Sequence, residues 1–385
     1  MAAPSAAADG RLSGLTFAVK DNIDVAGVPT TAGCPGFAYT PSESAVVVQR
    51  LNSAGAVAVG KTNMDQFATG LVGTRSPYGA CRCVFDERYI SGGSSSGSAV
   101  AVALGLVDFA LGTDTAGSGR VPAACNNIIG LKPTRGLLST RGVVPACRSL
   151  DCVSIFARTL DMAKRVFDVV RGFDAQDPYA RESAVAGVPI KRFGVLAPAQ
   201  REFFGDEEAA ALYELALQRF EPRTDIDFTP LHLAAQLLYS GPWVAERLAA
   251  IEPFFDQHAD AMDPVVREVI GGAKQYSAVD AFKAQYDLQR LKRQTDELWQ
   301  MVDALVLPTT PTIYSLAHVA ADPFRLNTNL GYYTNFVNLL DMSALAVPAG
   351  FRANGLPFGI SLVGPAFADT LLLEQAELYL TLGGT

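Results

Sequence analysis

The sequence predicts an α/β fold, and three features carry that prediction. Apolar runs of strand length alternate with stretches of helical spacing up to about residue 200. Residues 201–302 are rich in Ala, Gln, Glu, Leu and Lys, which favours helix, and strand-like runs return beyond them. The chain has 385 residues, 49% of them hydrophobic, which is enough to bury a large core. We therefore expect one domain over 11–385, with a helical lobe at about 201–302.

The first elements are expected close to the N-terminus. Residues 1–10 are rich in Ala, Pro and Ser and are predicted to be a disordered leader. The apolar run 15–19 predicts a strand, and helical spacing follows over 44–54. A second strand is expected over 56–59, and the small residues at 98–106 predict the start of a helix.

The last third of the chain carries a helix-capping signal and further strands. Ser277 and Asp280 have the spacing of a capping box, which predicts a long helix that ends near Val302. Later elements are a strand at 304–307, a helix at 336–340, strands at 344–347 and 359–363, and a final helix capped by Asp369.

Charge and composition argue against several classes of partner. The net charge is −8 and Lys and Arg do not cluster, so a nucleic-acid partner is not expected. The apolar run 99–107 is too short to span a bilayer, and residues 1–10 lack the features of a signal peptide. The six cysteines show no repeated C-x-x-C spacing, so free thiols, no metal site and a cytoplasmic location are expected.

Two glycine-serine clusters, 92–98 and 112–120, lie downstream of Lys20. A serine hydroxyl becomes a nucleophile only when a base removes its proton, and a neutral lysine can serve as that base. The three histidines lie far downstream, in no motif that suggests a Ser–His–Asp triad. Lysine normally titrates near pH 10.4, so Lys20 would have to be buried to act near neutrality, and Asp21 should point to the opposite face of its strand. The turn 115–118 can aim backbone N–H groups at a developing oxyanion.

Each of these signals has a simpler interpretation when it is taken alone. Residues 92–98 are typical of a flexible loop, and a lone lysine after a strand is most often a surface residue. A phosphate-binding loop is not supported, because no G-x-x-x-x-G-K-[ST] or G-x-G-x-x-G pattern occurs. The order and spacing of the signals, taken together, favour a Ser–Ser–Lys hydrolase.

Lys20, Ser94 and Ser118, in this order and at this spacing, resemble the pattern of the amidase signature family. The resemblance runs from about residue 12 to the C-terminus and implies a central mixed β-sheet surrounded by α-helices. It is supported by residues 60–65, 112–120, 122–124, 130–134 and 303–309.

The resemblance also implies a role for each residue. Ser118 would be the nucleophile, Ser94 a proton relay that follows a non-proline cis peptide, and Lys20 the base. The oxyanion hole would consist of the backbone N–H groups of Thr115, Ala116, Gly117 and Ser118. Asp114 and Arg120 would support the nucleophile loop from behind, although an ordinary structural ion pair explains either of them equally well.

Within the family, the chain is most similar to the subgroup that hydrolyses allophanate. The similarity lies in Ser96 and in residues 65–79, 115–122, 145–152 and 239–247. It implies that Tyr239 and Arg247 bind a carboxylate, which suits the planar fork of arginine. Both residues are expected on one face of a helix. The alternative is a solvated Arg247 and a core aromatic at Tyr239.

The implied reaction is hydrolysis of the terminal amide of allophanate through an acyl-enzyme, with release of ammonia and N-carboxycarbamate and without a cofactor. A homodimer is expected, with a functional link to urea carboxylase or to enzymes of cyanuric acid and biuret breakdown. Subgroup members often have an additional N-terminal helical segment and a second C-terminal domain, so the chain is either part of a longer protein or a one-domain form. The alternatives are another amidase of the family, the glutamyl-tRNA amidotransferase component that carries the amidase fold, or a non-catalytic scaffold.

Overall fold

The computed structural model of the protein describes residues 10–183 and 189–382. Of the expected leader, residues 1–9 lie outside the described residues. The strands are β1 (Thr16–Lys20), β2 (Val57–Thr62), β3 (Phe109–Asp114), β4 (Ile129–Lys132), β5 (Cys152–Ala157), β6 (Phe193–Leu196), β7 (Arg223–Ile226), β8 (Ala304–Pro308), β9 (Met342–Phe351) and β10 (Pro357–Pro365).

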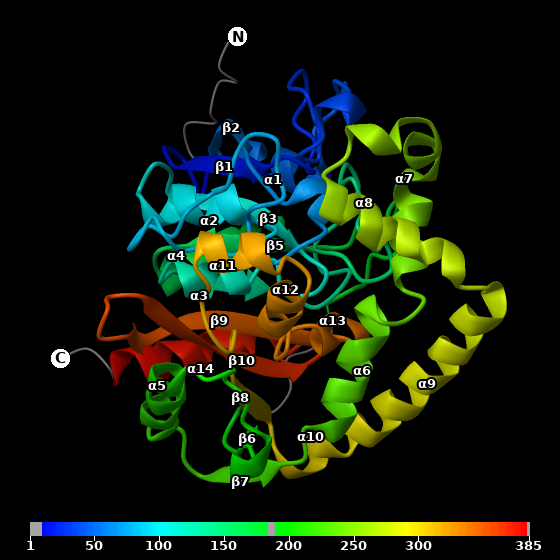
Figure 1. The fold of residues 1–385 in the computed structure, drawn as a ribbon. Helices are drawn as coiled ribbons and strands as arrows, with labels where there is room; N and C mark the ends of the chain where they lie inside the picture. Colours follow the sequence, from blue (N-terminus) through cyan, green and yellow to red (C-terminus); the bar gives the residue numbers. More distant parts are fainter. Residues whose placement is uncertain (1–9, 184–188, 383–385) are drawn as a thin grey trace.

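The helices lie mostly between the strands in sequence, and they surround the sheet in space (Figure 1). They are α1 (Val46–Ser53), α2 (Ser96–Ala103), α3 (Val121–Cys125), α4 (Leu160–Val170), α5 (Glu207–Leu217), α6 (Thr229–Tyr239), α7 (Val244–His258), α8 (Pro264–Gly271), α9 (Ala278–Asp296), α10 (Leu298–Met301), α11 (Leu316–Ala321), α12 (Arg325–Leu330), α13 (Phe336–Leu339) and α14 (Asp369–Thr381).

The described strands form one ten-stranded sheet in the order β2-β1-β3-β5-β4-β9-β10-β8-β6-β7. The three strands at each end run parallel, and the pairs between them are antiparallel, so the sheet is mixed as the resemblance implied. Strands β3, β4, β5 and β8 are buried along their whole length, including the polar residues Asp114 and Lys132 at the ends of β3 and β4.

The parallel pairing of β1 with β3 places the site. Val19 is the register partner of Leu111, so the carboxyl ends of the two strands meet at the same edge of the sheet. The rings of Phe17 and Phe109 stack 5.2 Å apart inside the core and hold the pair together. As a result Lys20, the last residue of β1, lies beside the end of β3.

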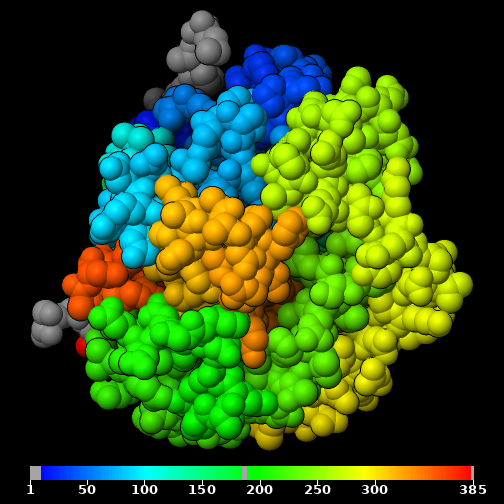
Figure 2. Space-filling view, viewed as in Figure 1, coloured from blue at the N-terminus to red at the C-terminus, as the bar shows by residue number. Residues whose placement is uncertain are grey.

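The helical lobe expected at about 201–302 contains most of the helices from α5 to α10 but also the short strand β7, which pairs with β6. In Figure 2 its yellow-green and yellow atoms lie beside the orange segment that carries α11 and α12. The long helix α9 begins with the expected capping box of Ser277 and Asp280. Because strands on both sides of the lobe join the same sheet, we propose that residues 11–385 form one domain.

The expected cap of the final helix is wrong. Asp369 is the first residue of α14, and Ala368 occupies the cap position. The Asp369 carboxylate instead accepts hydrogen bonds from the N–H (2.7 Å) and hydroxyl (2.6 Å) of Thr134. This long-range contact fastens the first residue of α14 to the segment that follows β4.

Candidate active site

Lys20 is fully buried and hydrogen-bonded to hydroxyl groups rather than to a carboxylate. Its Nζ donates to Ser94 Oγ at 2.8 Å and to Thr113 Oγ1 at 2.7 Å. Asp21 faces away, as the alternation of side chains along a strand predicts. The Asp21 carboxylate accepts from Thr31 and from the Gly33 N–H and lies 3.5 Å from Lys61 Nζ.

The burial of Lys20 favours a neutral amine. Burial lowers the pKa of Lys20 from 10.5 to about 7, although the carboxylates of Asp65, Asp114 and Asp151 oppose this shift. A lysine with this pKa is partly deprotonated at neutral pH, so it can accept a proton there. The surface-lysine interpretation is therefore wrong.

The Ser94 loop is fastened to the end of β3. The Gly93–Ser94 peptide bond is cis. The Ser95 hydroxyl donates to the Thr113 carbonyl (3.1 Å) and accepts from the Thr113 N–H (3.3 Å). The side chain of Asp65 lies so close to Gly93 that a Cβ atom there would overlap with Asp65 Oδ2. Residues 92–95 are accordingly an ordered, buried part of the site rather than a flexible loop.

The loop before α3 is organised by a buried ion pair. Arg120 donates to both oxygens of Asp114, from Nε at 2.9 Å and from Nη2 at 3.0 Å, and neither side chain is exposed. The same carboxylate accepts from the N–H groups of Gly117 (2.9 Å) and Gly119 (3.0 Å). Burial would raise the pKa of Asp114, but Arg120 lowers it overall, so the carboxylate stays charged.

Ser118 lies in the middle of this loop, with 3% of its surface exposed. Within residues 10–183 and 189–382 its hydroxyl has no hydrogen-bond partner, so the structure joins Lys20 to Ser94 directly but shows no bond from Ser94 to Ser118. A hydroxyl without a protein partner can turn toward an incoming carbonyl carbon or toward the relay serine.

The expected oxyanion donors are not equivalent. The Gly117 N–H already donates to Asp114 Oδ1 at 2.9 Å. Among the described residues, the N–H groups of Thr115, Ala116 and Ser118 have no acceptor. Three of the four expected donors are thus free for an oxyanion, and the Gly117 N–H instead helps to fix the loop.

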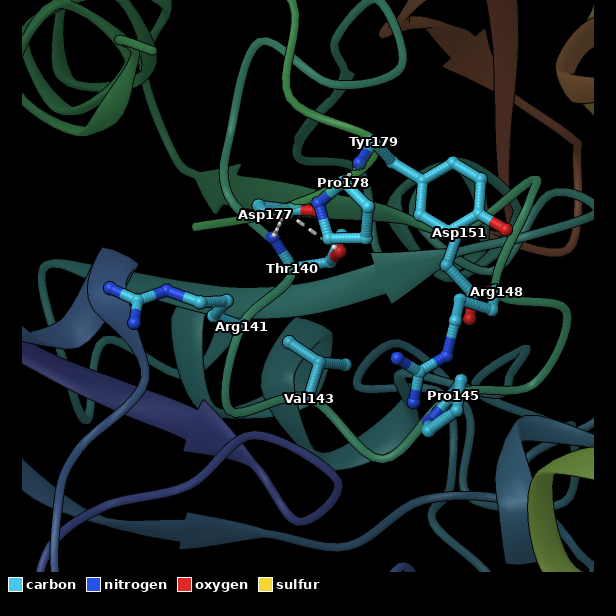
Figure 3. A pocket seen from close by; sticks show the side chains of 9 residues that line it. All are labelled: Thr140, Arg141, Val143, Pro145, Arg148, Asp151, Asp177, Pro178 and Tyr179. Atoms are coloured by element: carbon cyan, nitrogen blue, oxygen red, sulfur yellow. Dashed lines mark hydrogen bonds between the residues drawn. The ribbon is translucent and has the colours of Figure 1, made fainter. Parts of the chain in front are cut away.

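Asp151 is a residue of this site that the sequence analysis did not single out, although it lies in the motif 145–152. It accepts a hydrogen bond from the Thr115 hydroxyl and another from the Ala146 N–H at 2.8 Å. Burial raises its pKa to about 6. Asp151 also lines a small cavity of about 50 Å³ with Arg148 and Pro145 beside it (Figure 3). The residue therefore fastens the expected oxyanion loop at Thr115 to the segment that begins at Ala146.

Tyr239 and Arg247 meet, but not on one helix as expected. Tyr239 is the last residue of α6 and Arg247 lies in α7, because residues 240–243 interrupt the helix with Gly241 and Pro242. Arg247 Nη2 nevertheless donates to Tyr239 Oη at 3.1 Å, and the guanidinium lies 5.0 Å from the centre of the tyrosine ring. The turn between the helices brings the two side chains together.

Arg247 is a buried charge without an acidic partner. Only 2% of it is exposed, and its Nη1 donates to Thr69 Oγ1 (3.2 Å) and to the Ala68 carbonyl (3.3 Å). Its Nε is buried without a hydrogen bond, and within the described residues no carboxylate lies within 4.0 Å of the guanidinium. The solvated-residue interpretation is wrong, and such a group is suited to bind an anion.

The structure also bears on membrane-spanning helices, metal-binding groups and free cysteines. Within the part of the chain that the structure describes, no helix is long and apolar enough to cross a membrane. Those residues also contain no group of three or more His, Cys, Asp or Glu side chains that could hold a metal ion. All six cysteines are free thiols, as expected.

Comparison with known proteins was consistent with this geometry. The Amidase family model matches residues 2–373. Urea amidolyase of Saccharomyces cerevisiae is 51% identical over 380 residues, which cover 96% of this chain and 20% of that protein. Urea amidolyase of Lachancea kluyveri is 49% identical over 379 residues, which cover 96% of this chain and 21% of that protein. A glutamyl-tRNA(Gln) amidotransferase component of Halobacterium salinarum is 36% identical over 407 residues, 96% of either chain.

Among solved structures, Kluyveromyces lactis allophanate hydrolase superimposes with a TM-score of 0.92 at 47% identity, covering 96% of this chain and 62% of that one. The chain spans about a fifth of the length of the urea amidolyases it matches. The family match over most of the sequence and the shared fold lead to one conclusion: the chain belongs to the amidase signature family.

Proposed function

We propose that the chain hydrolyses the terminal amide of allophanate, a urea that carries a carboxylate. The observation that carries this proposal is the buried Arg247, which has Tyr239 as a hydrogen-bond partner but no carboxylate of the described residues within 4.0 Å. An arginine in this state can bind a substrate carboxylate through its planar fork. The names of two relatives, urea amidolyase and allophanate hydrolase, support the same substrate.

The proposed reaction uses a proton relay. Neutral Lys20 takes a proton from Ser94, and Ser94 takes one from Ser118 as the Ser118 oxygen attacks the amide carbonyl. The N–H groups of Thr115, Ala116 and Ser118 stabilise the oxyanion. The relay then returns a proton to the leaving nitrogen, and ammonia departs.

Water completes the proposed cycle. It attacks the acyl-enzyme with the same relay as base, which frees the Ser118 hydroxyl and gives N-carboxycarbamate. No step in this scheme calls for a cofactor. Since allophanate is urea plus one carboxylate, a reaction that carboxylates urea can supply it, and we propose urea carboxylase as the functional partner. Breakdown of cyanuric acid through biuret is the alternative supply, and a homodimer remains a prediction.

Ammonia release from freshly prepared allophanate tests this proposal. The purified chain is compared with Ser118→Ala and, as a matched control, with Ser53→Ala at the exposed end of α1. We expect release by the wild type and by Ser53→Ala, and none by Ser118→Ala. Release that persists in Ser118→Ala would exclude Ser118 as the nucleophile, and a folded wild type that releases no ammonia would exclude the substrate.

A role as a glutamyl-tRNA amidotransferase component is a second candidate, because the Halobacterium salinarum relative bears that enzyme's name and matches over 96% of its length. That function would require glutamine as the ammonia donor and further protein chains. Turnover of allophanate by the isolated chain, without any turnover of glutamine, would exclude it.

A further inference from the structure

Arg75 is a second buried arginine that no carboxylate of the described residues contacts directly, and nothing in the sequence analysis singled it out. Its residue surface is 4% exposed, and its Nε is buried without a hydrogen bond, as in Arg247. Within the described residues no carboxylate oxygen lies within 4.0 Å of its guanidinium. By contrast, the buried Arg120 and Arg352 each pair with an aspartate.

The hydrogen bonds of Arg75 are made to backbone carbonyls, which do not neutralise its charge. Nη1 donates to the Thr69 carbonyl at 2.9 Å and Nη2 to the Pro323 carbonyl at 2.7 Å. The carboxylate of Asp65 attracts Arg75 electrostatically. The oxygens of that carboxylate, however, accept hydrogen bonds from the backbone N–H groups of Val72, Gly73 and Arg75 rather than from the Arg75 guanidinium.

Arg75 and Arg247 are linked through one residue. Thr69 accepts from Arg75 with its carbonyl oxygen and from Arg247 with its hydroxyl oxygen. Among the described residues, two guanidinium groups without a directly contacting carboxylate therefore share Thr69 as an acceptor. Bringing two like charges together in a buried region is unfavourable, and the more distant carboxylates of Asp65 and Asp151 offset that repulsion only in part.

A cavity connects Arg75 to the solvent. It has a volume of about 270 Å³, and Arg75, Tyr239 and Asn327 are among the residues that line it. Figure 2 shows the surface hollowed in this region, between the orange segment and the green helix α6. Tyr239 reaches from the cavity wall to Arg247, so the cavity leads toward the Arg247 guanidinium. The acidic residue among those that line it is the exposed Glu268.

We propose that Arg75 is a specificity-determining residue: its charge in the cavity wall, which no carboxylate of the described residues contacts directly, selects anionic amides over neutral amides on their way to Arg247. The inference rests on the proposed function, because it assumes that the substrate carries a carboxylate. It goes further in assigning the selection to two arginines and in making the cavity the entry route. A purely structural Arg75, which only ties Thr69 to Pro323, would affect anionic and neutral amides equally.

The test compares malonamate, an anionic amide, with malonamide, its neutral counterpart. The ratio of their kcat/KM values is measured for the wild type, Arg75→Met, Arg75→Lys and the control Arg290→Met, whose side chain is exposed on α9. We expect Arg75→Met to lower the ratio at least about tenfold, and Arg75→Lys to restore most of it because the charge returns. Arg290→Met should leave the ratio unchanged. Added salt should reduce the preference of the wild type more than that of Arg75→Met.

The possible failures are distinguishable. If Arg75→Met lowers kcat/KM equally for malonamate and malonamide, the inference is overturned and the proposed function stands. The same conclusion follows if Arg75→Met leaves the ratio of the two values unchanged while Arg247→Met abolishes the preference for malonamate. If the wild type shows no preference for malonamate, carboxylate recognition fails as a whole. If Arg75→Met does not fold, Arg75→Lys and Arg75→Gln are compared instead. A higher malonamate-to-malonamide ratio of kcat/KM for Arg75→Lys than for Arg75→Gln supports the inference, and equal ratios overturn it. Hydrolysis of malonamide by both variants shows that the site is intact.

Discussion

Glu246 binds both the backbone N–H and the hydroxyl of Ser149, each at 2.7 Å, one with each carboxylate oxygen. This two-point contact joins the start of α7, where Arg247 lies, to the segment 145–152. The same segment carries Asp151, which supports Thr115 in the oxyanion loop. Arg247, the proposed carboxylate ligand, and Thr115 in the proposed oxyanion loop are therefore held by one piece of chain.

The first prediction concerns this contact. Glu246→Gln keeps the shape but replaces an acceptor oxygen by an amide donor, so one charge-assisted hydrogen bond is lost. We expect the KM for malonamate to rise about fivefold, which corresponds to roughly 1 kcal/mol, while kcat changes less. Steady-state kinetics measure both. Glu252→Gln, at an exposed position of the same helix, is the control, and an equal effect there would refute a positioning role for Glu246.

The second prediction is a pH dependence of the rate. With the pKa of Lys20 near 7, the amine is protonated and inactive as a base at lower pH. We expect kcat/KM for malonamate to rise about tenfold per pH unit below that pKa and to level off above it. Rates measured from pH 5.5 to 9 at constant ionic strength provide the check. A rate that does not change over this range, with chemistry rate-limiting, is incompatible with Lys20 as the base.

The third prediction is that the buried Lys20 lowers the free energy of unfolding of the protein. A lysine whose folded-state pKa lies below its ordinary value of 10.5 destabilises the fold fully below about pH 7, and this cost disappears as the pH approaches 10.5. Lys20→Met should therefore raise the free energy of unfolding at pH 6 by about 2 to 4 kcal/mol, and the gain should shrink by about 2 kcal/mol at pH 9.

Urea unfolding of the inactive variant and the wild type at both pH values measures this difference. The prediction fails if Lys20→Met is less stable at pH 6, or if the difference between the two proteins is independent of pH.

The fourth prediction compares two glycines. A Cβ at Gly93 would overlap with Asp65 Oδ2, whereas a Cβ at Gly60 has no atom within 4 Å. Gly93→Ala should cost about 1 to 3 kcal/mol of stability and displace Ser94, with loss of activity. Gly60→Ala should stay within about 0.5 kcal/mol of the wild type. Thermal unfolding and malonamate turnover are measured on both, and equal behaviour of the two variants would contradict the close packing of Asp65 against Gly93.

The features predicted well from the sequence are those that depend on neighbouring residues. The apolar run before Lys20 indicated β1, and the spacing of Ser277 and Asp280 indicated the start of α9. The helix expected across Tyr239 and Arg247 was wrong, because Gly241 and Pro242 end α6 in spite of the helical composition around them. Local turn chemistry outweighed the helical pattern there.

The parts of the site that the sequence analysis missed are long-range contacts. Asp65 and Asp151 influence Lys20 from segments far from it in the sequence. Both lie in motifs of the family resemblance, but nothing local assigns either carboxylate a role at the site. The cap predicted at Asp369 is wrong because its partner Thr134 lies in a distant segment. The partners of Arg75 are likewise backbone carbonyl groups, which no side-chain pattern reveals. A single sequence shows which groups are present but not which of them remain uncompensated after folding.

The site draws its parts from two regions of the fold. Lys20, Ser94 and Ser118 are carried by β1 and by the loops next to α2 and β3, whereas Tyr239 and Arg247 come from the turn between α6 and α7. An attempt to engineer the protein for other amides can therefore vary the turn between α6 and α7 and leave the proposed catalytic residues untouched. Because Glu246 is tied to Ser149, residues 145–152 would have to be exchanged together with that turn, as one cassette.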